Sequence, residues 1–157
     1  MPMNMRNDTL ARDLALGFIA GALAVPTFHH LMVYLLTAAG MIQGNLYSMR
    51  PVPPFGVPTI VNQMFWGGLW GVVLGLIANS ALRTWPLWLV GLLLGAIALP
   101  VVGWFVVAPI KSLPVAAGWN PTRMLASVII NAGWGFGAGL ILMLLRNLLG
   151  ARSTLRT

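Results

Sequence analysis

Six polar side chains that could do chemistry lie inside long apolar stretches of this sequence: His29, His30, Tyr34, Asn62, Gln63 and Asn131. Imidazole can carry a proton or bind a metal ion, and amides can donate and accept hydrogen bonds. Uncompensated polar groups are costly in hydrocarbon, so we expect the six to face one another or a wet cavity. They define a candidate polar site inside the membrane.

Four roles are open for this polar site. It can be a hydrogen-bonded cluster that sets helix register, the lining of a solute or ion path, a metal or haem site, or a pH sensor. Adjacent His29 and His30 diverge by about 100° around a helix, so they cannot easily bind one ion together. The chain has no other histidine, so a metal would need ligands from another helix or subunit.

Enzyme chemistry finds little support in the sequence. The only carboxylates are Asp8 and Asp13, and there is no cysteine. No H-E-x-x-H, phosphate-binding loop or G-x-S-x-G pattern occurs. We therefore expect a non-enzymatic protein with no resident cofactor, and haem or copper at His29 and His30 stays open as an alternative.

The composition indicates an integral membrane protein. Of the 157 residues 59% are hydrophobic and only 7% are charged, whereas a soluble domain has about 45–50% and about 25%. The net charge of +7 comes from scattered basic residues. This distribution favours a topology signal and contact with lipid headgroups over nucleic-acid binding.

The apolar stretches predict an all-α membrane protein with four transmembrane helices, because one span needs about 20 apolar residues. The predicted spans cover residues 14–41, 55–78, 87–110 and 122–149. The remaining segments are a cytoplasmic N-terminal arm (1–13), a proline-rich outer loop (42–54) and a basic cytoplasmic tail (150–157).

The distribution of basic residues predicts that both termini are cytoplasmic. With the N-terminus inside, the inner side holds Arg6, Arg12, Arg83, Arg146, Arg152 and Arg156, and the outer side holds Arg50, Lys111 and Arg123.

An internal similarity predicts a duplicated two-helix unit. Residues 17–26 and 91–100 both read G-x-x-x-G-A-x-A-[VL]-P, and residues 63–71 match 131–139 in their Trp-Gly-x-x-x-Gly segment. The prediction is two tandem parallel repeats, residues 14–80 and 81–149, related by a pseudo-twofold axis along the membrane normal.

Glycines repeat every fourth residue in all four predicted spans. The set comprises Gly17, Gly21, Gly67, Gly71, Gly75, Gly91, Gly95, Gly135 and Gly139. Residues four apart share a helix face, and a face without side chains lets two backbones approach closely. We expect these faces to pack the four helices together, with a narrow path or a dimer seam as the functional alternative. Pro26 and Pro100 are expected to kink their helices.

Two segments carry a family resemblance. Pro53-Pro54-Phe55-Gly56-Val57-Pro58, followed by residues 65–71, resembles small uncharacterised bacterial inner-membrane proteins with four spans. The resemblance covers Gly17 to Leu145 and implies a bacterial inner (cytoplasmic) membrane location. Those proteins supply no activity that could be carried over.

The first functional hypothesis is an accessory or assembly component that binds lipids and other spans through its glycine faces. Its expected partners are the bilayer and a second copy or other membrane-protein subunits. The alternative is a small oligomeric channel or transporter with its polar site at His29 and His30. The second alternative is intramembrane metal or haem binding.

Overall fold

The computed structural model describes residues 3–80 and 84–154, and within them four helices are long and apolar enough to cross a membrane. They are called spans one to four here, and they cover Thr9–Ala38, Thr59–Ile77, Leu87–Ile110 and Pro121–Leu149. The prediction of a mainly helical, multi-pass membrane protein with four spans is confirmed.

Two of the spans are interrupted by π-helical turns. Span one consists of α1 (Met3–Ala24), a π turn (Val25–His29) and α2 (His30–Ala38). Span three consists of α4 (Leu87–Leu93), α5 (Leu99–Val102) and α6 (Ala108–Ile110), separated by π turns at Leu94–Ala98 and Gly103–Val107. Span two is α3 (Thr59–Ile77), and span four is α7 (Pro121–Thr154).

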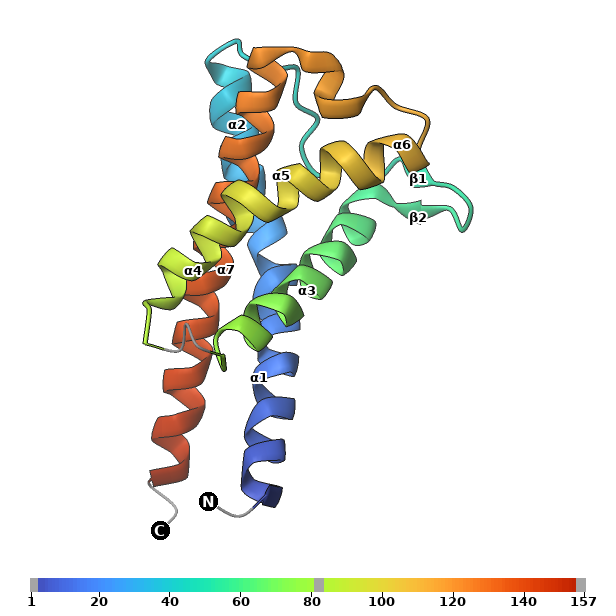
Figure 1. Cartoon of the computed structure of the whole chain (residues 1–157). Helices are drawn as coiled ribbons and strands as arrows, with labels where there is room; N and C mark the ends of the chain where they lie inside the picture. Colours follow the sequence, from blue (N-terminus) through green and yellow to red (C-terminus); the bar gives the residue numbers. More distant parts are fainter. Residues whose placement is uncertain (1–2, 81–83, 155–157) are drawn as a thin grey trace.

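The helices alternate in direction, so α1 begins and α7 ends at the same end of the molecule (Figure 1). That end is called the terminal end, and the opposite one, which carries the two long connections, is the loop end. Both α1 and α7 extend beyond the last turn of α3 at the terminal end (Figure 1). The cytoplasmic placement of this end stays a prediction.

Several predicted boundaries move. Span one ends at Ala38 instead of residue 41, and α7 continues to Thr154, inside the predicted tail. Helix α1 already begins at Met3, inside the predicted N-terminal arm. Span two starts at Thr59 instead of residue 55, because residues 51–58 form a hairpin in which β1 (Pro51–Val52) pairs antiparallel with β2 (Val57–Pro58). The residue before a proline avoids the helical region, so Pro58 prevents the helix from starting earlier.

Each π turn accompanies a proline within a span. Pro26 lies inside the first π turn, Pro100 follows the second and Pro109 follows the third. Proline lacks an N–H and its ring collides with the carbonyl four residues earlier, and a wider turn accommodates this mismatch. The kinks expected at Pro26 and Pro100 therefore take the form of π turns.

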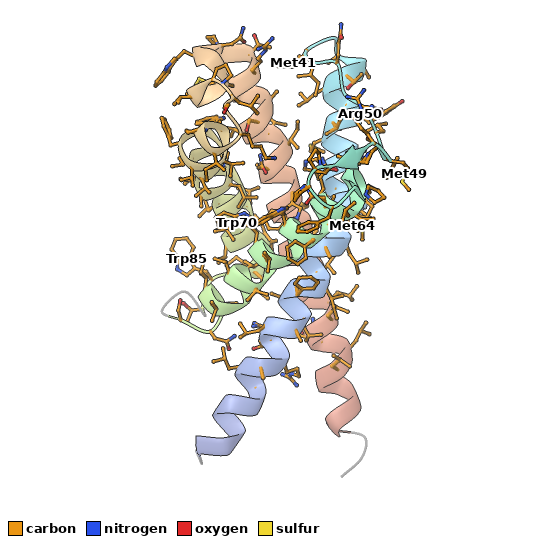
Figure 2. All side chains as sticks on the ribbon, turned by 90° about the vertical axis from the view of Figure 1, so that its right-hand side faces the viewer. Met41, Met49, Arg50, Met64, Trp70 and Trp85 are labelled. Atoms are coloured by element: carbon orange, nitrogen blue, oxygen red, sulfur yellow. The ribbon has the colours of Figure 1, made fainter. Side chains whose placement is uncertain are left out.

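Spans one and four form the centre of the molecule. Helix α3 packs against α1, the segment α4–α5 packs against α7, and α1 also packs against α7. Spans two and three touch each other only slightly, through α4, and they diverge toward the loop end (Figure 2). The shared core consists of Leu16, Ala20, Ala24, Val25, Leu74, Val90, Trp134, Ala138 and Leu142.

Glycines mediate the closest contact between spans one and two. A methyl group on Gly17 would collide with the carbonyl oxygen of Gly71, and one on Gly21 would collide with that of Gly67. The two backbones therefore lie in direct contact, as van der Waals packing in lipid favours.

Spans three and four make a contact of the same kind. A methyl group on Gly91 would collide with the carbonyl oxygen of Gly135, and one on Gly95 with that of Asn131. All nine glycines of the predicted packing set thus face another span of the same chain.

The two glycine contacts differ in register by one helical turn. Gly17 meets Gly71, but its sequence counterpart Gly91 meets Gly135 and not Gly139, the counterpart of Gly71. The Trp-Gly alignment of spans two and four is therefore not the alignment that the packing uses. Trp134 is buried, whereas its sequence counterpart Trp66 is exposed. The duplication itself stays a prediction.

Span four has a second glycine face that the sequence analysis did not identify. Gly133 lies under Met32 and Gly137 lies under the ring of Phe28, both from span one. Phe28 also makes an edge-to-face contact with Phe136 at 6.1 Å between ring centroids. One face of α7 thus receives span three while another receives span one.

An ion pair joins spans one and four toward the terminal end. The Nε of Arg146 donates to Oδ1 of Asp13 at 3.1 Å, and Nη2 lies 2.9 Å from Oδ2. Asp13 is only 3% exposed. A two-point arginine–carboxylate contact satisfies the buried charge and sets the register between α1 and α7.

We expect Gly71→Ala to destabilise the protein by about 1–3 kcal/mol, the usual cost of overpacking, because the methyl group meets the backbone of Gly17. The measurement is unfolding by SDS titration from mild detergent, followed by circular dichroism. The control is Gly103→Ala, whose methyl group has no atom within 4 Å. Equal losses in the two variants would contradict the close crossing.

We expect Arg146→Met to cost about 3–5 kcal/mol in the same unfolding assay, because it leaves the Asp13 carboxylate buried without a partner. The double variant with Asp13→Asn should recover most of the loss. Arg123→Met, at an exposed position of the same helix, serves as the control. A double variant as unstable as the single one would refute this account of the pair.

Candidate polar cavity

A cavity of about 380 Å³ lies among the four spans, in the half nearer the loop end. Four of the six predicted site residues line it: His29, Asn62, Gln63 and Asn131. The other lining residues are Val25, Trp66, Gly67, Trp70, Leu99, Val102, Gly103, Val107, Lys111, Ser127 and Trp134. It is called the interspan cavity here.

The cavity exists because the outer spans diverge. The contact of Gly21 with Gly67 holds spans one and two together near its floor. From there α3 and α5–α6 separate toward the loop end (Figure 2). Span three leaves additional room at Gly103, where a side chain would meet no atom within 4 Å. Asn131 lies ten residues after the start of α7, about 15 Å along the helix.

His29 is the most unusual group in the cavity. It ends the π turn of span one, and its Nδ1 is buried without a hydrogen-bond partner among the described residues. Buried polar atoms normally have partners, because an unpaired one loses the hydrogen bond it would make to water. This nitrogen is thus an unsatisfied polar atom in a residue that lines the cavity, and it has almost no accessible surface of its own.

The amide side chains give the cavity both donors and acceptors. Asn131 donates from Nδ2 to the carbonyl of Ser127 at 2.8 Å, which leaves its oxygen free to accept. Gln63 turns its oxygen toward Nε2 of His30 at 3.4 Å, which leaves its NH₂ group to donate. Such a set can orient a small polar molecule through several hydrogen bonds.

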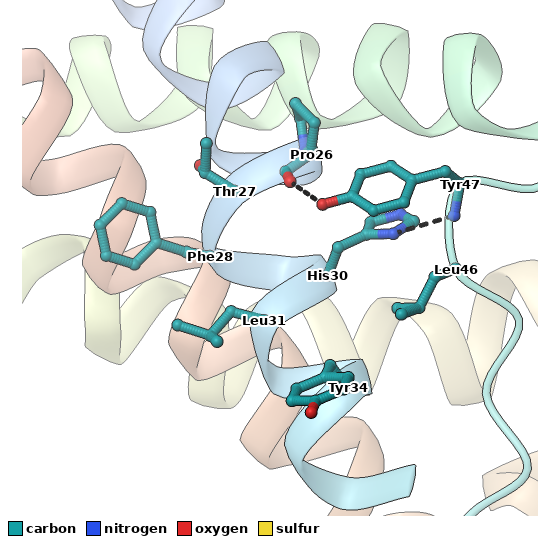
Figure 3. Close-up of a pocket in the computed structure, with 8 residues that line it drawn as sticks. All are labelled: Pro26, Thr27, Phe28, His30, Leu31, Tyr34, Leu46 and Tyr47. Atoms are coloured by element: carbon teal, nitrogen blue, oxygen red, sulfur yellow. Dashed lines mark hydrogen bonds between the residues drawn. The ribbon is translucent and has the colours of Figure 1, made fainter. Parts of the chain in front are cut away.

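The structure does not bring all six predicted site residues together. His30 and Tyr34 line a shallow groove on the opposite side of span one, of about 460 Å³ (Figure 3). Its lining consists of Pro26, Thr27, Phe28, His30, Leu31, Tyr34, Leu46 and Tyr47. Adjacent helical positions point in different directions, so His29 faces the cavity and His30 faces the loop. Tyr34 is 56% exposed and belongs to no polar cluster.

Tyr47 attaches the long loop to span one in this groove. Its ring stacks on His30 with centroids 4.5 Å apart, and its backbone N–H donates to Nδ1 of His30 at 3.2 Å. Its hydroxyl donates to the carbonyl of Pro26 at 2.8 Å (Figure 3). With Nδ1 accepting, the proton of a neutral His30 lies on Nε2, which faces Gln63.

The π turn explains why Pro26 accepts this bond. In a regular helix its carbonyl would receive the N–H of His30, but that N–H bonds to the carbonyls of Val25 and Thr27. The hydroxyl of Tyr47 occupies the acceptor instead. Backbone groups in the membrane need partners within the protein, and here the loop provides one.

Trp134 connects span four to spans one and two at the floor of the cavity. It is 2% exposed, and its Nε1 donates to the carbonyl of Gly21 at 2.9 Å. The carbonyl is accessible because glycines at Gly21 and Gly67 leave space beside it, so that Trp134 also packs over Gly67.

The geometry offers little to a metal ion. No cluster of three or more His, Cys, Asp or Glu side chains occurs in the described part of the chain. Both ring nitrogens of His30 are already engaged. Of the predicted pair, only His29 would have a free nitrogen.

Several residues of the site were not predicted as part of it. Lys111, Trp66, Trp70 and Gly103 carried no signal that would place them together, because they come from different parts of the chain. Ser127 lies four residues before Asn131 and so shares its helix face. Gly133 and Gly137 share the four-residue spacing of the predicted glycines and could have been recognised from it. The role of Tyr47 depends on the loop conformation.

In fold and site the chain is a multi-pass membrane protein with a polar cavity among its four spans. Comparisons with family models, with curated proteins and with solved structures find no match to it. The resemblance to small bacterial inner-membrane proteins therefore stays a prediction.

We expect Tyr47→Phe to lower stability by about 1 kcal/mol, the net value of one hydrogen bond, because it removes the donor to Pro26. Hydrogen exchange of the backbone amides in residues 44–50 should also become faster. Tyr34→Phe is the control, because its exposed hydroxyl makes no hydrogen bond within the described residues. If the two variants behave alike, the Tyr47 contact does not hold the loop.

Proposed function

We propose that the protein is a small membrane transporter whose solute site is the interspan cavity. The observation that carries the proposal is that polar side chains from three of the four spans line this one cavity. These are His29 from span one, Gln63 from span two and Asn131 from span four, and Lys111, the residue that follows span three, joins them in the lining. Polar groups inside a membrane are expensive, and their convergence favours a ligand site over scattered structural hydrogen bonds.

The cavity is closed toward the terminal end, which supports access from one side at a time. The exposed residues of its lining are Trp66, Val107 and Lys111. On the side of the terminal end the spans close on Trp134, Leu74 and Leu142, whose side chains are almost completely buried. A site near the middle of the membrane, reached from one side at a time, is the usual arrangement in secondary transporters.

The π turns also support transport. Val25 and His29 belong to the first π turn, Gly103 and Val107 belong to the third, and all four line the cavity. Transporter sites are commonly built at interrupted helices, and π turns concentrate at functional sites. Under the predicted topology the cavity lies in the outer half of the membrane.

The accessory or assembly role loses its main argument in this fold. That hypothesis used the glycine faces as binding surfaces for other proteins or lipids. All nine predicted glycines instead pack against spans of the same chain. An assembly role would therefore need a different surface, whereas the cavity is available as it stands.

The test is solute uptake into proteoliposomes, measured by stopped-flow light scattering after an osmotic jump with urea, glycerol, sodium butyrate or choline chloride. We expect at least one solute to enter faster than into empty liposomes. Gly103→Leu should slow this uptake by about tenfold or more, since raising the barrier by about 1.4 kcal/mol is sufficient. The new side chain points into the open space at Gly103.

The matched control is Val101→Leu, two residues away on the same span, at an exposed position outside the cavity lining. It should transport like the natural protein. The transport proposal is wrong if no solute enters faster than into empty liposomes, or if both variants lose uptake equally. Native mass spectrometry of the same preparation would reveal a second copy or a foreign subunit and so test the assembly hypothesis.

A further inference from the structure

We infer that the solute is a small organic anion, namely a carboxylate with a short apolar chain. This inference rests on the proposed transport function and specifies its substrate class. The charge of the cavity, the presence of both polar and apolar residues in its lining, and its volume point to this class of solute.

The charge of the cavity favours an anion. No aspartate or glutamate lines it, and Lys111 is its one charged residue among those described. Asp13 is paired with Arg146 toward the terminal end, outside the cavity. An anion in the cavity therefore meets an ammonium group at the rim and no opposing carboxylate, so that its desolvation is partly compensated.

The polar groups beyond Lys111 suit a carboxylate. The NH₂ group of Gln63 is free to donate because its oxygen faces His30. His29 lines the same cavity and its Nδ1 has no partner among the described residues, so that once the ring turns to expose this nitrogen it donates in the tautomer that carries its proton there. Carboxylate oxygens accept several hydrogen bonds at once, and donors from two spans can therefore hold one such group.

The apolar part of the lining suits a short hydrocarbon chain. Span three contributes Leu99, Val102 and Val107 to the cavity, and Trp70 contributes an aromatic ring from span two. Gly103 lies between these aliphatic residues and leaves the wall open. An apolar chain of the ligand would exchange water for these side chains.

The volume limits the length of that chain. About 380 Å³ is near the lower end of the range for small-molecule pockets, about 300–1,000 Å³. A carboxylate with a few carbon atoms fits such a space, whereas a phospholipid or a long acyl chain does not.

The test compares three ligands of the same shape but different charge. Sodium butyrate, butyramide and n-butylammonium chloride are titrated into the detergent-solubilised full-length protein in a calorimeter. We expect butyrate to bind about tenfold more tightly than butyramide, as one charge-assisted hydrogen bond allows, and butylammonium not to bind.

Lys111→Gln should weaken butyrate binding by about tenfold and leave butyramide binding unchanged. The control is Arg123→Gln, which removes an exposed cation near the loop end that does not line the cavity, and it should change neither affinity. A loss for both ligands with Lys111→Gln would indicate a change in structure and overturn the assigned role of its charge.

The outcomes separate this inference from the transport proposal. Equal binding of butyrate and butyramide, or tighter binding of butylammonium, overturns the anion inference. Uptake of another solute into the proteoliposomes would still support the transport proposal. If none of the three ligands binds, a short carboxylate is excluded as the substrate. If in addition no solute enters the proteoliposomes, both proposals fail.

Discussion

The direct contact between the backbones of spans one and two, at Gly21 and Gly67, is the constraint on which the other contacts depend. Lipid chains are as apolar as leucine, so burying apolar surface does not drive two helices together in a membrane, and close van der Waals contact does. Any side chain at these positions would separate the helices. The same two glycines leave the carbonyl of Gly21 accessible to the indole N–H of Trp134, which attaches span four.

The prolines have the opposite effect to the glycines, because they change the path of a helix instead of holding two helices together. Close packing by glycine holds the floor of the molecule together, and the π turns at Pro26 and near Pro109 change the helix path above it. The wider turn of span one redirects the N–H of His30 away from Pro26, whose carbonyl then bonds to Tyr47 in the loop. A backbone irregularity in the membrane thus determines where the loop attaches, because the polar group that it exposes must find a partner.

Most polar side chains within the described spans are engaged by the protein itself. Asp13 has Arg146, His30 has Tyr47 and Gln63, and Trp134 has Gly21. His29 differs because its Nδ1 has no partner in the described residues. This contrast adds to the proposed function, because a group that binds a ligand keeps bonding capacity in reserve.

The sequence alone determined the class of protein, the number of spans, most of the glycines that pack between spans and four of the cavity residues. Hydropathy over a span and the four-residue spacing of glycines are local properties, so they can be recognised before any contact between helices is known. The separation of His29 from His30 was also implicit in the 100° between adjacent helical positions, although their surroundings were not.

Only the tertiary structure decided the rest. The two glycine contacts differ in register by one helical turn, and Trp134 is buried on Gly21 while Trp66 is exposed, even though both tryptophans occur in the same Trp-Gly pattern. The divergence of spans two and three, which brings Lys111, Gly103 and Ser127 into one cavity, has no local signature either. The physical reason is that helix register and crossing depend on contacts between distant residues, and a single helical segment does not contain them.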